Sequence, residues 1–257
     1  MVVEIISIGE ELLIGKVVNT NASWIAKRMM EMGLKVRRIV TVGDDIDEIV
    51  SAIQDSIRRG AKIIVTTGGL GPTFDDKTME AISKATNRPL KLENEVLMEI
   101  EEKLRKRGRK LSEAAKKMAY VPEGSKIIHN NIGTAPGIIL DYNNAKIIAL
   151  PGVPEEMENM FETEVVKMIK FEGKFQETEF LIYNVTESEL AQTIIELMRE
   201  IPNIYIKSHP IISTEDKISL KLHIYSTSYD EESWRKIIDE IRNKIIEKHN
   251  YCEIRGI

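Results

Sequence analysis

Short runs of apolar, β-branched residues alternate along the chain with longer segments of helical periodicity. Residues 2–8, 36–42 and 62–67 are such runs, and each is followed by polar residues or glycine. The segments between them carry apolar stripes of helical spacing, over residues 22–32 and 46–57. This order is typical of buried parallel strands joined by helices. The first two-thirds of the chain is therefore predicted to be a doubly wound α/β domain with a mostly parallel sheet and helices on both faces.

The rest of this domain is predicted from further periodic segments. Helices are expected over residues 77–86, 93–106 and 112–118, and residues 138–150 indicate a β-hairpin around a polar turn. Residues 154–170 are again helical. We therefore place the first domain at residues 1–172.

A second, small domain is predicted over residues 179–257. The segment before it, residues 171–178, is polar and contains Gly173, as expected of a boundary. Amphipathic helices over residues 187–199 and 232–248 alternate with apolar strand-like segments. A β-α-β-β-α sandwich of the α+β class fits this order.

Composition narrows the class of protein. The chain has 257 residues and a formal net charge of -5, with Lys and Arg interspersed among Asp and Glu, which argues against a nucleic-acid-binding face. The one basic run, residues 103–110, follows Glu101 and Glu102 in a helical pattern and is interpreted as a solvated face. A single cysteine, Cys252, permits no intramolecular disulfide, and no signal peptide or membrane segment is recognisable. We expect a cytoplasmic protein.

A glycine-rich turn is the strongest local signal. Gly68, Gly69 and Gly71 lie between a predicted buried strand and the start of a helix. Glycines in this position let backbone N–H groups approach an anion, and the helix N-terminus adds partial positive charge. The turn matches neither the Walker loop nor the dinucleotide fingerprint. The alternative is a tight turn that needs glycine for steric reasons alone.

Carboxylates follow each of the three predicted strands, at residues 10–11, 44–45 and 75–76. In an open parallel sheet, ligands bind outside the carboxyl ends of the strands, so these acids would face a bound phosphate. A divalent cation would relieve their mutual repulsion, because Mg²⁺ or Mn²⁺ accepts carboxylate and phosphate oxygens together. The alternative for Asp44 and Asp76 is a role as helix N-caps.

Several motifs occur in an order that resembles the CinA family. They are residues 9–13 with 19–21, residues 67–73 with 75–78, residues 131–137 and residues 150–157. The resemblance covers residues 1–170 and extends to molybdopterin-binding domains of the MogA and MoaB type and to the pyrophosphatase-like half of some FAD synthases. It implies a sheet of the molybdopterin-binding type. Residues 184–225 look like the small second domain of CinA proteins.

The resemblance also implies an activity. It implies a metal-dependent pyrophosphohydrolase that acts on ADP-ribose or a related dinucleotide diphosphate, with Mg²⁺, Mn²⁺ or Co²⁺ as cofactor. Longer CinA proteins carry a C-terminal deamidase domain, which is not expected here because the chain ends at Ile257. Relatives commonly form dimers or trimers, so we expect a homo-oligomer, most simply a dimer. The alternatives are a molybdopterin- and AMP-binding protein of molybdenum cofactor biosynthesis and a non-catalytic nucleotide-binding module.

Catalytic roles are assigned to the acids of these motifs. Asp44 and Asp76 are expected to hold the metal, directly or through water. The metal would lower the pKa of a bound water, and Glu11 or Asp45 would take its proton. Asp76 is thus both a metal ligand and a catalytic residue in this interpretation.

Substrate binding is assigned to the remaining motif residues. Gly68, Gly69 and Gly71 are expected to hold the diphosphate through backbone N–H groups. Asn19 and Asn21 suit ribose or base contacts, since an amide both donates and accepts hydrogen bonds. The other expected substrate contacts are Thr67, Pro72, Thr73, Thr78, Thr134, Gly137, Gly152, Pro154 and Glu155, the last toward a sugar hydroxyl.

Overall fold

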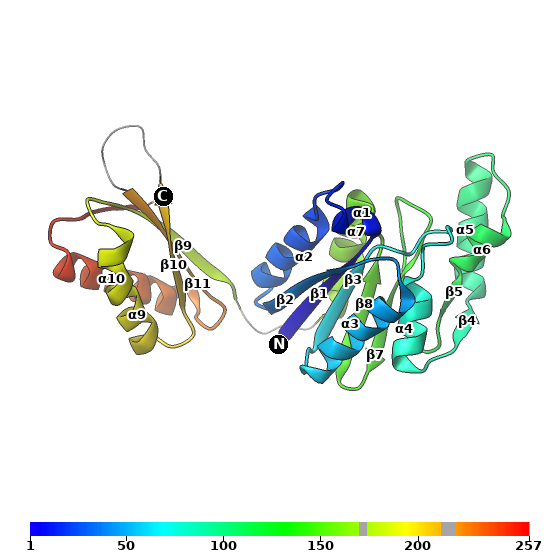
Figure 1. Cartoon of the computed structure of the whole chain (residues 1–257), viewed down its shortest axis with the longest axis horizontal. Helices are drawn as coiled ribbons and strands as arrows, with labels where there is room; N and C mark the ends of the chain where they lie inside the picture. Colours follow the sequence, from blue (N-terminus) through cyan, green and yellow to red (C-terminus); the bar gives the residue numbers. More distant parts are fainter. Residues whose placement is uncertain (170–173, 212–218, 257) are drawn as a thin grey trace. The chain divides into compact units, whose positions relative to one another are not determined.

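The chain divides into two compact units (Figure 1). The computed structural model describes residues 1–169, 174–211 and 219–256. The first unit holds nearly all of the chain up to residue 171, and the second holds the remainder. Residues 171–173, at the start of the predicted boundary, lie outside the described part. Among the described helices, none is long and apolar enough to cross a bilayer.

A six-stranded sheet in the order β2-β1-β3-β8-β7-β6 forms the centre of the first unit. Its strands are β1 (Val2–Ile8), β2 (Lys35–Val42), β3 (Ile63–Thr67), β6 (Lys126–Ile128), β7 (Gly137–Tyr142) and β8 (Ala145–Leu150). Neighbouring strands from β2 to β8 pair in parallel, whereas β7 is antiparallel to both β8 and β6. The predicted doubly wound, mostly parallel sheet is confirmed, and the predicted hairpin is β7–β8.

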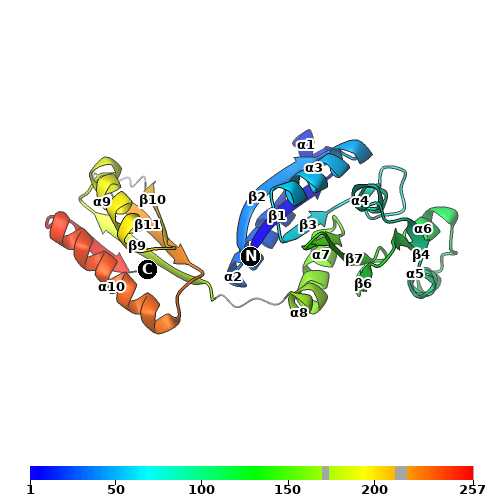
Figure 2. The same cartoon turned by 90° about the horizontal axis from the view of Figure 1, so that it is seen from below.

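Helices cover both faces of this sheet. Figures 1 and 2 show α3 (Ile46–Arg58) and α4 (Thr78–Thr86) on one face, and α2 (Thr20–Glu31) and α7 (Pro154–Met160) on the other. The apolar stripes face the sheet as predicted, because their residues are buried: Ala22, Ile25 and Met29 on α2, and Ile49, Val50 and Ile53 on α3. The helix expected after residue 154 is interrupted by a π-helical turn at Phe161–Val165 before α8 (Val166–Met168).

The segment between α4 and β6, here called the excursion, lies beside the sheet. It contains β4 (Leu90–Leu92), α5 (Asn94–Lys106), α6 (Glu113–Lys117) and β5 (Tyr120–Pro122). The two helices were predicted, but β4 and β5, which pair antiparallel, were not, and neither was β6. Each of these strands has three residues, which is too short for an alternating pattern to be recognised.

The second unit is a four-stranded antiparallel sheet in the order β10-β11-β9-β12 with two helices. Its elements are β9 (Gln176–Tyr183), α9 (Glu187–Glu200), β10 (Tyr205–Ile211), β11 (Ser219–Ser226), α10 (Glu231–Lys248) and β12 (Glu253–Gly256). Both helices share one core with alternate residues of the sheet, such as Leu220, Leu222 and Ile224. The predicted order is present, and β12 is an additional strand that pairs with β9.

A buried ionic cluster fixes the central strand of the first unit. The side chain of Glu4, in β1, is fully buried and accepts hydrogen bonds from Nη2 of Arg37 at 2.6 Å and Nη2 of Arg59 at 2.7 Å. Burial alone would raise the pKa of Glu4, but the hydrogen bonds from Arg59 and Arg37 lower it to about 2. The carboxylate therefore stays ionised and ties β1 to β2 and to the end of α3.

We predict that Glu4→Gln destabilises the first unit by about 2–3 kcal/mol at neutral pH, because it leaves two guanidinium groups without their carboxylate. The folded pKa of Glu4 lies below the unfolded value, so its contribution is complete above about pH 4.5 and is lost as the pH falls toward 2. Urea unfolding of both proteins between pH 7 and pH 2.5 measures this difference.

Glu102→Gln is the control, since Glu102 pairs with Lys106 on the exposed face of α5. It should change stability far less than Glu4→Gln. A difference in the free energy of unfolding between wild type and Glu4→Gln that stays constant from pH 7 to pH 2.5 would contradict a stabilising, ionised Glu4.

Candidate active site

The candidate site lies where the order of strands reverses. The chain passes from β1 to β2 on one side and from β3 toward β8 on the other, so a crevice opens outside the carboxyl ends of β1 and β3. Gly68 crosses this crevice in close contact with β1. A Cβ at Gly68 would lie 2.1 Å from the carbonyl oxygen of Ile8, and the φ of Gly68 is +108°. Only glycine can occupy this position without moving the two strands apart.

The glycine turn presents free backbone donors. Gly68 donates its N–H to the carbonyl of Leu150 at 3.0 Å, so the expected role of this N–H in phosphate binding is corrected. In the described chain, the N–H groups of Gly69, Leu70 and Gly71 donate to no protein acceptor. Three unpaired backbone donors in succession are a feature of anion-binding concavities, so this turn is a candidate anion site.

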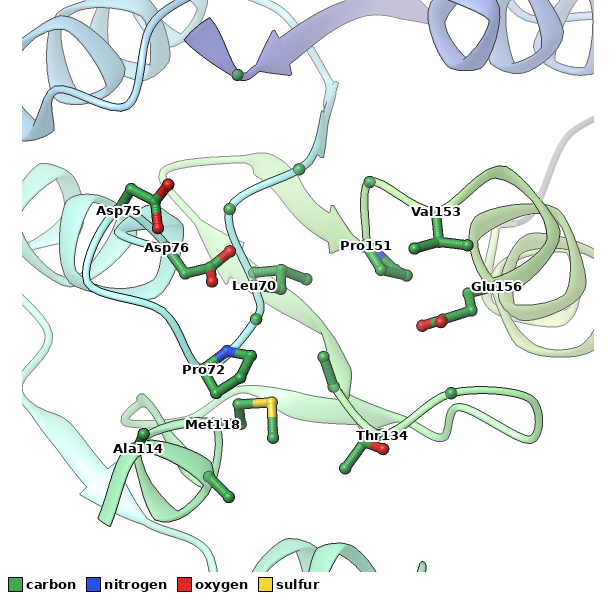
Figure 3. Close-up of a pocket in the computed structure, with 18 of the residues that line it drawn as sticks. Leu70, Pro72, Asp75, Asp76, Ala114, Met118, Thr134, Pro151, Val153 and Glu156 are labelled. Carbon is green, nitrogen blue, oxygen red and sulfur yellow. The ribbon is translucent and has the colours of Figure 1, made fainter. Parts of the chain in front are cut away.

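A cavity of about 870 Å³ opens in front of this turn. One wall is the edge of the sheet and the other is the excursion, with Met118 and Ala114 facing Leu70 and Pro72 (Figure 3). The predicted site residues that line it are Glu11, Asp44, Gly68, Gly69, Gly71, Pro72, Asp76, Thr134, Gly152 and Pro154. Five segments far apart in the sequence therefore converge on one cavity.

Asp76 closes the turn that follows the glycines. Its Oδ2 accepts hydrogen bonds from the N–H of Thr73, at 2.8 Å, and from the Thr73 hydroxyl. Lys117 of α6 donates to the carbonyl of Asp76 at 2.6 Å. The N-cap residue of α4 is Lys77, so Asp76 is not a helix cap. Its carboxylate is instead held at the cavity wall, beside Asp75 (Figure 3).

The neighbouring acids Asp44 and Asp45 have different roles. Asp45 is the N-cap of α3, because its Oδ1 accepts hydrogen bonds from Asp47 N at 2.8 Å and Glu48 N at 3.1 Å. It is absent from the cavity lining, so its expected role as a proton acceptor is corrected to a cap. Asp44 lines the cavity and accepts the N–H of Glu10 at 2.9 Å, which fixes it beside α1 (Glu10–Leu13). Of the two expected proton acceptors, Glu11 and Asp45, only Glu11 lines this cavity, so it is the candidate base.

The acidic side chains along the cavity suit a metal ion that is coordinated jointly by the protein and a substrate. Glu11, Asp44 and Asp76 line one cavity, but the described residues contain no preassembled group of three or more His, Cys, Asp or Glu side chains that could hold a metal ion. Mg²⁺ is commonly bound by one or two carboxylates together with substrate phosphates and water. The carboxylates present fit that mode of binding, in which the protein supplies only some of the metal ligands.

Other residues expected to contact substrate instead hold the crevice together. Asn19 accepts the N–H of Ala22 and so caps α2, while its Nδ2 donates to the Thr41 hydroxyl at 3.3 Å. Asn21 donates to the Thr67 hydroxyl and to the carbonyl of Gly152, both at 2.9 Å. The structure therefore places these two amides between strand ends and outside the lining of the large cavity.

Three of the four predicted threonines and two further residues also lie outside that lining. Thr67 is buried and donates to the carbonyl of Pro151 at 2.9 Å, and Thr78 is buried and donates to the carbonyl of Gly68 at 2.8 Å. The hydroxyl of Thr73 binds carboxylates of its own turn, which lowers the pKa of Asp75. Gly137 begins β7, where a Cβ would lie 2.5 Å from the carbonyl oxygen of Ala149. Glu155 is exposed at the start of α7.

Two residues that the sequence interpretation missed shape the opposite wall. The side chain of Glu156, next to Glu155, lines the cavity (Figure 3) and accepts a hydrogen bond from Asn130 Nδ2 at 2.7 Å. Asn130 is almost fully buried, and its Oδ1 accepts the N–H groups of Ile132 and Gly133. Those two N–H groups are therefore unavailable to a ligand. The buried asparagine before the Gly133 loop carried no signal in the sequence.

The basic run also belongs to the cavity, in part. Arg107, Arg109 and Lys110 line it, opposite the glycine turn. The interpretation of residues 103–110 as a solvated face holds for Lys103 and Lys106, which pair with glutamates of α5. The end of the run is exposed as well, and it also borders the cavity.

Comparison with known proteins identifies the family. A family described as the probable molybdopterin-binding domain matches residues 4–170. The chain belongs to this family. Its relatives include proteins of Saccharolobus islandicus (strain L.S.2.15 / Lassen #1), 45% identical over 95% of this chain and 93% of the relative, and of Sulfolobus acidocaldarius, 41% identical over 94% and 92%.

A solved member of the family supports the first unit. The crystal structure of CinA from Thermoplasma acidophilum, described as of unknown function, is 38% identical with a TM-score of 0.61. The match covers 65% of this chain and 98% of that chain. The resemblance to CinA proteins is thereby confirmed for the first unit, and the expected likeness of residues 184–225 to a second CinA domain stays a prediction.

We predict that Asp76→Asn lowers kcat by about two orders of magnitude or more while leaving stability nearly unchanged, because the amide oxygen can still accept from Thr73 but carries no charge for a metal. Asp45→Asn is the matched control, since Asn caps a helix about as well as Asp. Turnover of a dinucleotide diphosphate and thermal unfolding are measured for both variants. Equal kcat in wild type and a folded Asp76→Asn variant would remove Asp76 from the chemistry.

Proposed function

We propose that the protein is a divalent-metal-dependent pyrophosphohydrolase that cleaves the diphosphate of ADP-ribose or a related dinucleotide. The observation that carries this proposal is one cavity lined both by Gly69, Leu70 and Gly71, whose N–H groups have no protein acceptor, and by the acids Glu11, Asp44 and Asp76. Unpaired N–H groups bind phosphate oxygens, and carboxylates beside a phosphate require a cation. A site for a neutral ligand needs neither feature.

The chain's own residues supply binding, orientation and proton transfer. Asp44 and Asp76 would hold a cation that, when bound, withdraws charge from phosphorus and acidifies water. The free N–H groups of residues 69–71 hold the non-bridging oxygens and stabilise the charge that develops on them. Water adds to one phosphorus, its proton passes to Glu11, and the bridging P–O bond breaks to leave two phosphate monoesters.

The size and lining of the cavity suit a ligand with ring systems. About 870 Å³ lies within the range of pockets that enclose drug-sized ligands. Leu70, Pro72 and Met118 give it an apolar side next to the free N–H groups. A heterocyclic base can pack there while its phosphates reach the glycine turn.

The second candidate is a pterin nucleotide as ligand. The description of the family as a probable molybdopterin-binding domain favours it. A pterin ring would use the same apolar side of the cavity, and its phosphate the same N–H groups. The two candidates differ in whether a diphosphate bond is cleaved.

The decisive experiment incubates the protein with ADP-ribose, FAD, NAD or molybdopterin-AMP, with and without Mg²⁺, Mn²⁺ or Co²⁺. We expect phosphate monoester products only when a metal is supplied, because otherwise the carboxylates repel the diphosphate. Products are separated by anion-exchange chromatography. Undiminished turnover in excess EDTA, after verified metal removal, would refute the mechanism, and tight binding without cleavage would favour the binding module.

We also propose that the protein forms a dimer through its first unit. Leu13, Ile14 and Val18 expose 52%, 66% and 79% of their surface just after α1. Apolar side chains exposed together commonly mark a contact between chains. This apolar group is the candidate contact.

Light scattering across a dilution series should give twice the chain mass of 29.3 kDa. The pair Ile14→Glu and Val18→Glu should give monomers, because burying a charge in an apolar contact is costly. Ile246→Glu, at an exposed position of α10, is the control and should leave the mass unchanged. A strictly monomeric wild type would rule the dimer out.

A further inference from the structure

The chain changes direction at Gly108, near the end of the basic run of residues 103–110. Gly108 follows α5 with a φ of +69°, and the N–H of Arg109 donates to the carbonyl of Leu104 at 2.8 Å. This pairing is typical of a helix that ends at a glycine in the left-handed conformation. It directs residues 109 and 110 away from the exposed face of α5, and both line the cavity.

The cations of the run fall into two groups by their partners. Lys103 and Lys106 form ion pairs with Glu99 and Glu102. Arg109 and Lys110 form no side-chain hydrogen bond or ion pair within the described ranges of the chain. Both residues are exposed cations that border the cavity, and an anionic ligand would supply the partner that the described chain does not.

Arg107 supports the wall on which these cations lie. It donates from Nη1 to the Thr134 hydroxyl at 3.2 Å and from Nη2 to the carbonyl of Ile132 at 3.1 Å. These bonds join the end of α5 to the loop held by Asn130 and Glu156. The basic wall is therefore braced against the rest of the cavity.

The lining of the cavity combines three kinds of group. The free N–H groups and carboxylates belong to the edge of the sheet, the cations follow α5, and Leu104, Met118 and Ile132 are apolar. A ligand that contacts all three carries a phosphate, a ring and a second anionic group. A diphosphate alone offers no ring for the apolar side chains.

We propose that Arg109 and Lys110 form a second anion subsite, which selects nucleotides that carry an additional phosphate monoester on the ribose. This inference rests on the proposed function for the position of the 5′-phosphate at the glycine turn. It adds a substrate class: dinucleotide diphosphates phosphorylated on a ribose hydroxyl. The alternative is that these cations only balance the partial negative charge at the C-terminus of α5.

Binding of nucleotides without a diphosphate tests the subsite apart from catalysis. Isothermal titration with AMP, adenosine 2′,5′-bisphosphate and adenosine 3′,5′-bisphosphate is done on the full chain at about 0.15 M salt with Mg²⁺. We expect at least one bisphosphate to bind about tenfold or more tightly than AMP, because it gains charge-assisted hydrogen bonds. None of these ligands contains a diphosphate bond that could be hydrolysed. The binding result can therefore be interpreted even if the protein proves not to be a pyrophosphohydrolase.

The double variant Arg109→Gln/Lys110→Gln should reduce that preference to within about twofold while AMP binding is retained. Arg105→Gln is the matched control, because Arg105 is an exposed cation of the same run outside the cavity lining. Circular dichroism checks folding, and the single variant Arg109→Gln, expected to lose part of the preference, replaces the double variant if that one is unfolded.

Three results would overturn the proposal. The first is equal affinity of wild type for AMP and both bisphosphates, or binding of none of them. The second is an equal loss of AMP and bisphosphate affinity in the double variant, which would assign the cations to the 5′-phosphate. The third is an equal loss of preference in Arg105→Gln, which would indicate a general effect of charge.

Discussion

The contact between Gly68 and the backbone of Ile8 is the constraint on which the candidate site depends. It brings the ends of β1 and β3 to a separation that no side chain at residue 68 would permit. Because Gly68 then reaches Leu150, the next three N–H groups are left without protein partners. Backbone geometry thus creates the candidate anion site, and the threonines and asparagines around it hold strand ends in place. Substitution of those polar residues would act on the site only through the backbone.

The sequence was informative where a periodic pattern extended over several residues. The parallel strands, the long helices and the order of elements in the second unit could be predicted in this way. Three-residue strands such as β4 could not, since they show less than two periods. Within the site, the sequence pattern does not show which of two adjacent identical residues faces the cavity. Asp44 lines the cavity while Asp45 caps α3, and Glu156 lines it while Glu155 is exposed.

The basic run illustrates a different limit. Its composition predicts a solvated face, and ion pairs on α5 agree with this for its first part. A reversal at Gly108 separates the last two cations from the helix. The lining of one cavity then combines unpaired cations with carboxylates and apolar side chains.

The buried carboxylate in β1 also affects how the first unit forms. Glu4 belongs to the first strand of the chain, but its two guanidinium partners come from β2 and from the end of α3. Enclosing an unpaired carboxylate in apolar surroundings is strongly unfavourable. Strand β1 can therefore be covered only after the chain has emerged from the ribosome as far as Arg59, so the N-terminal β-α-β-α segment docks in one cooperative step and not strand by strand.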